Sequence, residues 1–212
     1  MFKNFKKLET FYSNLSSCSN STNMFYECIA LKDFDANLDG VETADGMFYK
    51  CKELVGFYND LGACTSASGT FNDCSKLKFF QSKLSKIEDG SKMFSSCSSL
   101  EEFTSNLESL TNAEDMFKDC SKLKTFDAIM PKLVDGSEMF KDCTELETFY
   151  SKLSELNDAT NMFSACRKLK YFHSHMYKLP SGEFMFKDCY QLESFKGDVT
   201  EMISGRGMFY KC

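Results

Sequence analysis

One motif recurs along the whole chain every 23 residues, without an insertion or a deletion. Phenylalanine marks the repeat at ten positions: Phe2, Phe25, Phe48, Phe71, Phe94, Phe117, Phe140, Phe163, Phe186 and Phe209. Nine of the eleven cysteines mark it again: Cys28, Cys51, Cys74, Cys97, Cys120, Cys143, Cys166, Cys189 and Cys212. A fixed period of this length is the signature of a solenoid, in which each repeat buries its apolar side against its neighbours.

The unbroken register predicts a single domain over residues 1–212, made of nine repeats. Residues 1–23 are in register, but Phe5 stands where every later repeat has cysteine. We therefore expect this repeat to be an N-terminal cap, whose larger ring covers an open end. Residues 208–212 begin a tenth repeat that stops before its leucine. An uncapped end exposes apolar surface, so we expect that the chain continues in a longer protein or that this end docks onto another molecule.

One half of each repeat has the period of a strand. From Phe34 the chain reads Phe-Asp-Ala-Asn-Leu, and the equivalent stretches also alternate apolar or small residues with polar ones. This period of two predicts a strand with one buried face. Such strands side by side would form a parallel sheet. We expect the small middle residue, Ala36 in this repeat, to face inward and to let the opposite layer approach.

The return half of the repeat has the pattern of a short helix. One column holds only residues that are favoured at helix N-caps: Thr43, Ser66, Asp89, Asn112, Asp135, Asp158, Ser181 and Ser204. Behind this column, Met93, Cys97 and Leu100 have the spacing of one helix face. We expect one or two helical turns per repeat, held by packing on the sheet. The predicted fold is an α/β repeat solenoid, with a parallel sheet on one face and short helices on the other.

The order Gly/Ala-x-x-Met-Phe-x-x-Cys-x-x-Leu-x-x-Phe resembles the BspA-type leucine-rich repeat along the whole chain. It is also similar to repeats of mycoplasma and gut-bacterial surface proteins. Methionine stands here where many members have alanine, and phenylalanine where isoleucine is common. The resemblance implies a right-handed leucine-rich-repeat solenoid. It also implies a surface or interaction protein, often an adhesin.

The cysteine column has three interpretations. Disulfides would need a unique pairing. Equally spaced cysteines offer no unique pairing, and the total of eleven is odd. Zinc sites need paired spacings such as Cys-x-x-Cys, and the chain has none. Buried thiols behave as small hydrophobic groups. We favour reduced structural thiols, with Cys18 and Cys64 also in the core, and we predict no metal or cofactor.

Composition narrows the function classes. A net charge of -6 with interspersed signs argues against a nucleic-acid binder, and the absence of a long apolar run argues against membrane insertion. The chain has only two histidines, no Gly-rich phosphate loop and no Gly-x-Ser-x-Gly motif, so we do not expect an enzyme. The many thiols, and the lack of an apolar stretch behind the first lysines, favour a reducing interior. The family resemblance implies the cell surface instead.

The outward face of the sheet is the surface that the repeat leaves free for function. Its first half is a mildly acidic strip, formed by Asp33, Asp35, Asn37, Tyr58 and Asp60. Its later half holds the predicted partner-binding residues: Tyr150, Lys152, Tyr171, His173, His175 and Lys196. Adjacent strands stand about 5 Å apart, so Tyr150 and His173 should form one patch beside Tyr171. Tyrosine-rich patches are typical interface anchors.

His173 and His175 point the same way on their predicted strand, which would suit a metal ion or a pH-sensitive contact. Only Asp198 could join them, so we predict no metal site. The predicted function is a non-enzymatic interaction or adhesin-like scaffold that binds a protein or glycan through the sheet face. The alternative is a structural building block that assembles end to end through Met208, Phe209 and Cys212.

Overall fold

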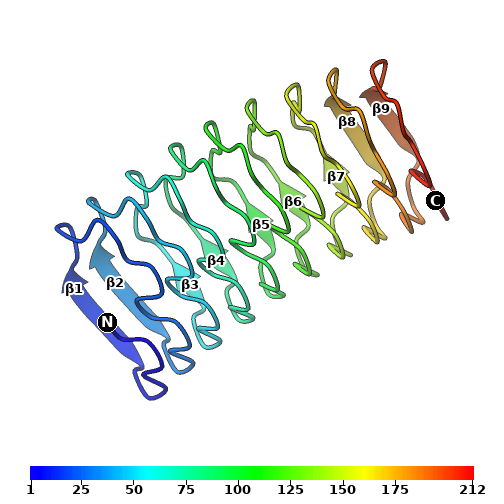
Figure 1. Cartoon of the computed structure of the whole chain (residues 1–212). Helices are drawn as coiled ribbons and strands as arrows, with labels where there is room; N and C mark the ends of the chain where they lie inside the picture. The colour runs from blue at the N-terminus through cyan, green and yellow to red at the C-terminus, as the bar shows by residue number, and fades with distance from the viewer.

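The computed structural model describes residues 1–212 and shows a row of stacked coils that follow one another in sequence order (Figure 1). Each coil contributes one strand. The strands are β1 (Thr10–Asn14), β2 (Asp33–Asn37), β3 (Gly56–Phe57), β4 (Phe79–Phe80), β5 (Glu102–Phe103), β6 (Thr125–Phe126), β7 (Thr148–Phe149), β8 (Tyr171–His175) and β9 (Ser194–Asp198). Paired strands are parallel and one repeat apart, as where Phe172 lies opposite Phe195. The predicted parallel-sheet solenoid is confirmed.

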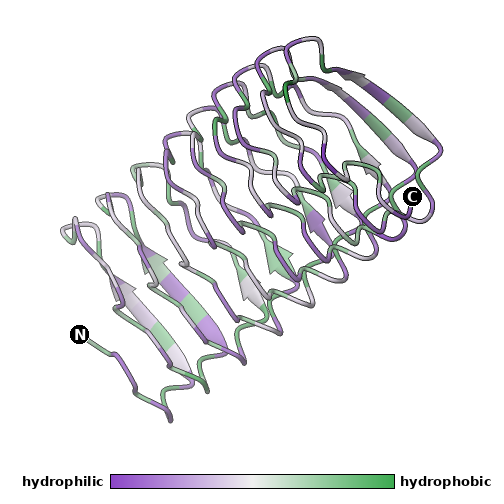
Figure 2. Ribbon diagram, turned by 45° about the vertical axis from the view of Figure 1, so that its right-hand side comes forward, coloured by the Kyte–Doolittle hydropathy of each residue, from purple (hydrophilic) through white to green (hydrophobic).

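Burial alternates along the strands as the period of two predicts. In β2, Phe34 and Ala36 are buried, whereas Asp33, Asp35 and Asn37 are exposed. Figure 2 shows the same alternation as hydrophobic and hydrophilic bands along the strands. One face of the sheet therefore packs into the solenoid, and the other is open to solvent.

The strands are longest at the two ends of the stack. β1, β2, β8 and β9 have five residues each, and β3 to β7 have two. In the middle coils, side chains of the small inward column replace part of the backbone ladder. The Ser151 hydroxyl donates to the Ala128 carbonyl at 2.9 Å, and the Leu61 N–H donates to the Ser82 hydroxyl at 3.0 Å. These bonds join coils where backbone pairing stops.

The short helices expected on the opposite side do not form, so this part of the prediction is wrong. Each coil instead makes successive tight turns, in which N–H groups bond three residues back, as from Cys97 to Phe94. Lys92 and Ser96 both have a left-handed backbone, at φ +56° and +61°, and equivalent residues of the other coils do the same. Left-handed residues end a right-handed helix. The Phe94 N–H bonds the Met116 carbonyl of the next coil at 2.8 Å, rather than its own coil.

The column expected to cap helices forms a second ladder between coils. Its members pair in parallel bridges along the whole stack, for example Asp89 with Asn112. Several also bond to their own coil, as where the Asp135 carboxylate accepts the Ser137 N–H at 2.9 Å. This is the local turn that Asp and Asn side chains favour. The residue preference reflects a side-chain-supported turn rather than a helix N-terminus.

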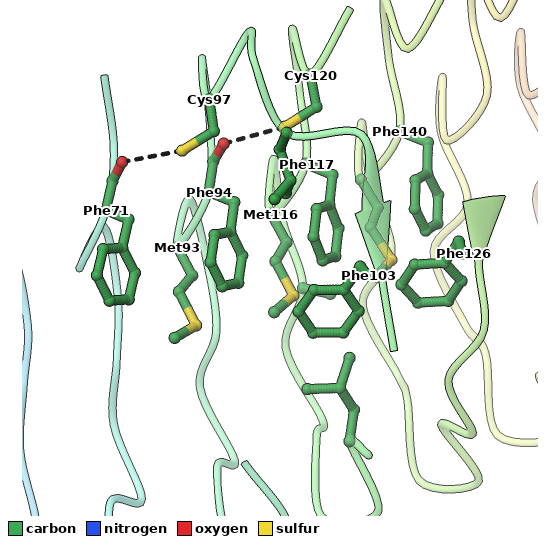
Figure 3. Close-up of a cluster of buried hydrophobic side chains, with 14 of the residues drawn as sticks. Phe71, Met93, Phe94, Cys97, Phe103, Met116, Phe117, Cys120, Phe126 and Phe140 are labelled. Atoms are coloured by element: carbon green, nitrogen blue, oxygen red, sulfur yellow. Dashed lines mark hydrogen bonds between the residues drawn. The ribbon is translucent and has the colours of Figure 1, made fainter. Parts of the chain in front are cut away.

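Two phenylalanine columns form the centre of one continuous core (Figure 3). Within a column the rings stack in parallel, and the Phe117 ring lies 5.3 Å from Phe94 and 5.5 Å from Phe140. Between the columns the rings meet edge to face, with Phe117 lying 4.9 Å from Phe103 and 5.5 Å from Phe126. Both geometries are favoured for aromatic pairs. The interleaved rings hold each coil in register with its neighbours.

All eleven cysteines are free thiols, and the main column has a structural role beyond filling space. The Cys97 thiol donates to the Phe71 carbonyl at 3.2 Å, and the Cys120 thiol donates to the Phe94 carbonyl at 3.1 Å (Figure 3). The same bond recurs at every cysteine of this column. Each thiol therefore stabilises the contact with the preceding coil. Cys64 is buried as expected, while Cys18 is only half-buried.

Candidate partner-binding surface

The predicted partner-binding residues lie on the open sheet face over the last three strands, β7 to β9 (Figure 1). The pairing of β8 with β9 sets His173 beside Lys196 and His175 beside Asp198. These side chains share one face because alternate residues of a strand point the same way. Tyr150 and Lys152 follow β7 and add the preceding row.

Five of the six predicted residues line one shallow depression, formed by Tyr150, Lys152, His173, His175 and Lys196 together with Ser151 and Ser174. The Tyr150 and His173 rings meet edge to face, with 5.2 Å between their centroids. His175 instead stacks on Tyr177, at 5.4 Å and an interplanar angle of 11°. The depression is thus framed by rings on two sides, as the row spacing predicts for Tyr150 and His173.

Tyr171 is the sixth residue, and it lies beside the depression rather than in its lining. Its hydroxyl donates to the Glu193 carboxylate at 3.2 Å. This bond to a carboxylate is the main reason that the pKa of Tyr171 is raised above its ordinary value. The phenol is thereby kept as a neutral hydrogen-bond donor at the rim.

The depression carries unbalanced positive charge. Lys152 and Lys196 take part in no ion pair, although thirteen lysine–carboxylate contacts occur elsewhere, such as Lys178 with Glu155 at 2.6 Å. The nearby Asp198 accepts the backbone N–H of Thr200 and its hydroxyl, and these bonds lower its pKa, with a smaller contribution from His175. The two free ammonium groups make this surface complementary to anionic groups.

No group of three or more His, Cys, Asp and Glu side chains lies close enough to hold a metal ion. His173 and His175 therefore gain no third ligand from Asp198 or any other residue. No helix of the structure is long and apolar enough to cross a bilayer. The surface over β7 to β9 therefore offers aromatic rings, cationic groups and hydrogen-bond donors on a broad sheet.

The predicted assembly-end residues differ in exposure. Met208 is buried at 6% exposure, while Phe209 is 44% exposed and Cys212 is also exposed. The Phe209 ring stacks on Phe186 at 5.5 Å, and the Cys212 thiol donates to the Phe186 carbonyl. At the other end, the Phe5 ring is exposed and meets the Phe2 ring edge to face at 6.1 Å.

The structure also reveals an exposed group of three aromatic rings and one valine that the sequence did not predict as a group. Tyr12, Val55, Tyr58 and Phe79 gather on the open face over β1 to β4. Only Tyr58 was expected on this surface. Phe79 lies outside both core columns of phenylalanine, and that departure from the repeat was the available signal.

Stacked coils with one parallel strand each place the molecule among the leucine-rich-repeat solenoids. A leucine-rich repeat protein of T. pallidum has a TM-score of 0.57 at 23% identity, over 74% of this chain and 79% of that chain. One from Bacteroides ovatus has a TM-score of 0.55 at 18% identity, over 100% of this chain and 66% of that chain. A leucine rich cell surface protein of Faecalibacterium prausnitzii has a TM-score of 0.42 at 15% identity, over 90% and 68% of the two chains. No curated protein matches the chain.

The chain belongs to the BspA-type leucine-rich-repeat family. Six copies of the family's repeat region match over residues 1–89, 64–170 and 136–212. These segments together span the whole sequence, so the resemblance seen in the Met-Phe-x-x-Cys motif is confirmed.

Proposed function

We propose that this protein is a non-enzymatic interaction module that binds an acidic segment of a protein partner through the open sheet face. The single observation that carries the proposal is the depression lined by Tyr150, Lys152, His173, His175 and Lys196. Rings and uncompensated ammonium groups converge there, on a surface that the core does not need. Aromatic residues anchor interfaces, and complementary charge selects the partner and steers its approach.

The neighbouring Tyr171 adds a further exposed ring beside the depression, with its hydroxyl held by the Glu193 carboxylate. No nucleophile–base pair or metal centre accompanies these residues, so their chemistry is that of reversible contacts. A flat sheet spanning several strands suits an extended segment of a partner rather than a small molecule. The family's broad use as an interaction scaffold supports the proposal by analogy.

The test uses a fluorescent peptide of alternating Gly and Glu, titrated with the intact protein and followed by anisotropy at low salt. We expect Lys152→Gln with Lys196→Gln to weaken binding roughly tenfold, and Tyr150→Ser with His173→Ser to weaken it by a similar factor. Added salt should weaken the wild-type complex because exposed charges are screened.

The matched control is Thr125→Ser with Thr104→Ser, which changes exposed residues of the same sheet face in the middle coils. This variant should bind the peptide as the wild type does. Equal affinity of the lysine double variant and the wild type, with unchanged thermal unfolding, would reject the surface.

A second proposal, from a different class, is end-to-end assembly through Met208, Phe209 and Cys212. It is supported by the last coil, whose Phe209 and Cys212 contacts to Phe186 repeat those of interior coils. Heterologous contacts of that kind produce filaments unless they close into rings. Sedimentation over a range of concentrations should then show growing oligomers, and Phe209→Ser should abolish them. A persistent monomer would exclude this second function.

A further inference from the structure

A second depression lies on the same open face at the other end of the stack, over β1 to β4. Its lining includes Tyr12, Asp33, Asp35, Gly56, Tyr58 and Phe79. It shares no residue with the depression over β7 to β9, so it is a separate site.

Three large rings in this depression are open to solvent. Tyr12 is 66% exposed, Tyr58 is 65% exposed and Phe79 is 47% exposed. Gly56 determines how one of them lies. A Cβ atom at Gly56 would come within 2.7 Å of Tyr58 Cε2 and 2.8 Å of its hydroxyl oxygen, so the ring lies against the bare backbone of β3. One ring face is thereby presented to the solvent side of the depression.

Two carboxylates, Asp33 and Asp35, line the depression without a cationic partner. Asp35 is the register partner of Tyr12, and it precedes Tyr58 by one repeat, so it lies in the row between the two tyrosines. Asp33 and Asp35 form no ion pair. Lys32 also lines the depression, but its ammonium group is bound to Glu9 at 3.0 Å, so its charge is already paired. The site is therefore negative, and it complements a cation.

We propose that this depression binds an arginine side chain of a protein partner. The guanidinium group is planar, so it can lie on an aromatic face while its N–H groups bond a carboxylate. Tyr12 and Tyr58 are two strand spacings apart, roughly 10 Å between backbones, which leaves room for a flat group over Asp35. A lysine ammonium has the charge but not the plane, so it fits the arrangement less well.

The test uses labelled peptides of alternating Gly and Arg, and of alternating Gly and Lys, titrated with the intact protein at low salt. The arginine peptide should bind about threefold or more tightly than the lysine peptide. Asp33→Asn with Asp35→Asn should weaken its binding roughly tenfold. Gly56→Ala leaves every charge in place but displaces the Tyr58 ring, and it should weaken binding about threefold.

Asp127→Asn is the matched control, because it removes an exposed carboxylate from the column of Asp35 four coils further along. It should leave the arginine peptide's affinity unchanged. Lys152→Gln with Lys196→Gln should not weaken binding of the arginine peptide either. The same variant should weaken binding of the acidic peptide, so the two sites are tested separately. Undiminished binding to the Asp33 and Asp35 double variant, equal loss with Asp127→Asn, or no saturable binding by the wild type would each overturn the proposal.

Discussion

The two ends of the open sheet face carry opposite charge on the same backbone. At the first end, Asp35 lies between exposed tyrosines and no lysine neutralises it. At the second end, Lys196 lies beside His173, and no carboxylate neutralises it. Both sets occupy the same outward columns of the repeat. The difference teaches that buried columns define the fold, whereas the outward columns are free to define the ligand.

The two surfaces are far enough apart to act separately. Asp35 and His173 are six repeats apart in the same column. At about 4.8 Å per strand this places them roughly 29 Å apart. Screening at physiological salt reduces interactions beyond about 8 Å. A partner that engages both surfaces would therefore need charges separated along its own length, basic at one end and acidic at the other.

The largest expected effect is on the cysteine column, which the two ends share. Burial raises the pKa of Cys97 and Cys120 in this column above the ordinary value of 9.0, and it raises the pKa of Cys64, which lies outside the column, to about 11. The unfolded thiols ionise first as pH rises, so their contribution is complete below pH 9 and is lost above it. Between pH 8 and pH 10 the free energy of unfolding should fall by roughly 1 kcal/mol for each buried thiol. Urea melts at both pH values measure the loss.

Cys64→Val provides the control, because Val41 and Ile87 occupy the same column of neighbouring coils. This variant should keep the fold and reduce the loss between pH 8 and pH 10 by roughly 1 kcal/mol. An unchanged pH dependence would show that the Cys64 thiol does not contribute.

Both sheet surfaces should lose their ligands together at alkaline pH if one core supports them.

The next effect compares a buried ring with an exposed one. Phe117→Ala should lower the free energy of unfolding by about 3 to 5 kcal/mol, because it removes a fully buried ring between four others. Phe79→Ala should change it by less than about 0.5 kcal/mol, because Phe79 is half exposed. Urea denaturation measures both. Similar losses for the two variants would contradict the division between core columns and surface positions.

The repeat predicts the strands and the core because its period reports burial directly. Phe34 and Ala36 alternate with acidic residues, and only an extended chain buries both. The prediction of helices was wrong because tight turns, rather than a helix, bring Met93, Cys97 and Leu100 to one side of the coil. The sequence did contain a signal against helices, in the column of Asn23, Gly46 and Gly69. Asn and Gly adopt the left-handed backbone most readily, and that backbone interrupts a right-handed helix.

The surface was predictable only where strand register alone determines it. Tyr150 and His173 are one repeat of 23 residues apart in the same outward column, and the structure brings their rings together. The first depression depends on more than register. Tyr58 lies against β3 because Gly56 has no side chain, and a repeat pattern does not encode how a ring leans on its neighbour.

A smaller effect is expected from exchanging the charges of the two surfaces. Asp33→Lys with Asp35→Lys should abolish the preference of the first depression for an arginine peptide. Lys152→Glu with Lys196→Glu should likewise abolish the preference of the second for an acidic one. Each change should shift affinity by roughly tenfold or more, because like charges then face each other. Anisotropy titrations with both peptides measure the exchange, and a variant that retains its original preference would show that charge does not select the ligand there.

The smallest expected effect concerns the left-handed turn residue on the side of the coils opposite the sheet, which differs between the two ends of the stack. Phe184 has a left-handed backbone at φ +54°, where the first coils place Asn23, Gly46 and Gly69. That conformation costs a bulky residue about 1 to 2 kcal/mol. Its ring lies over Gly207 and 5.8 Å from the Arg206 guanidinium, contacts that offset part of the cost. Phe184→Asn should therefore raise the free energy of unfolding by about 0.5 kcal/mol, as measured by urea melts. Asn161→Phe, at the same position one coil earlier, should lower it, and destabilisation by Phe184→Asn would show that the ring's contacts exceed the backbone cost.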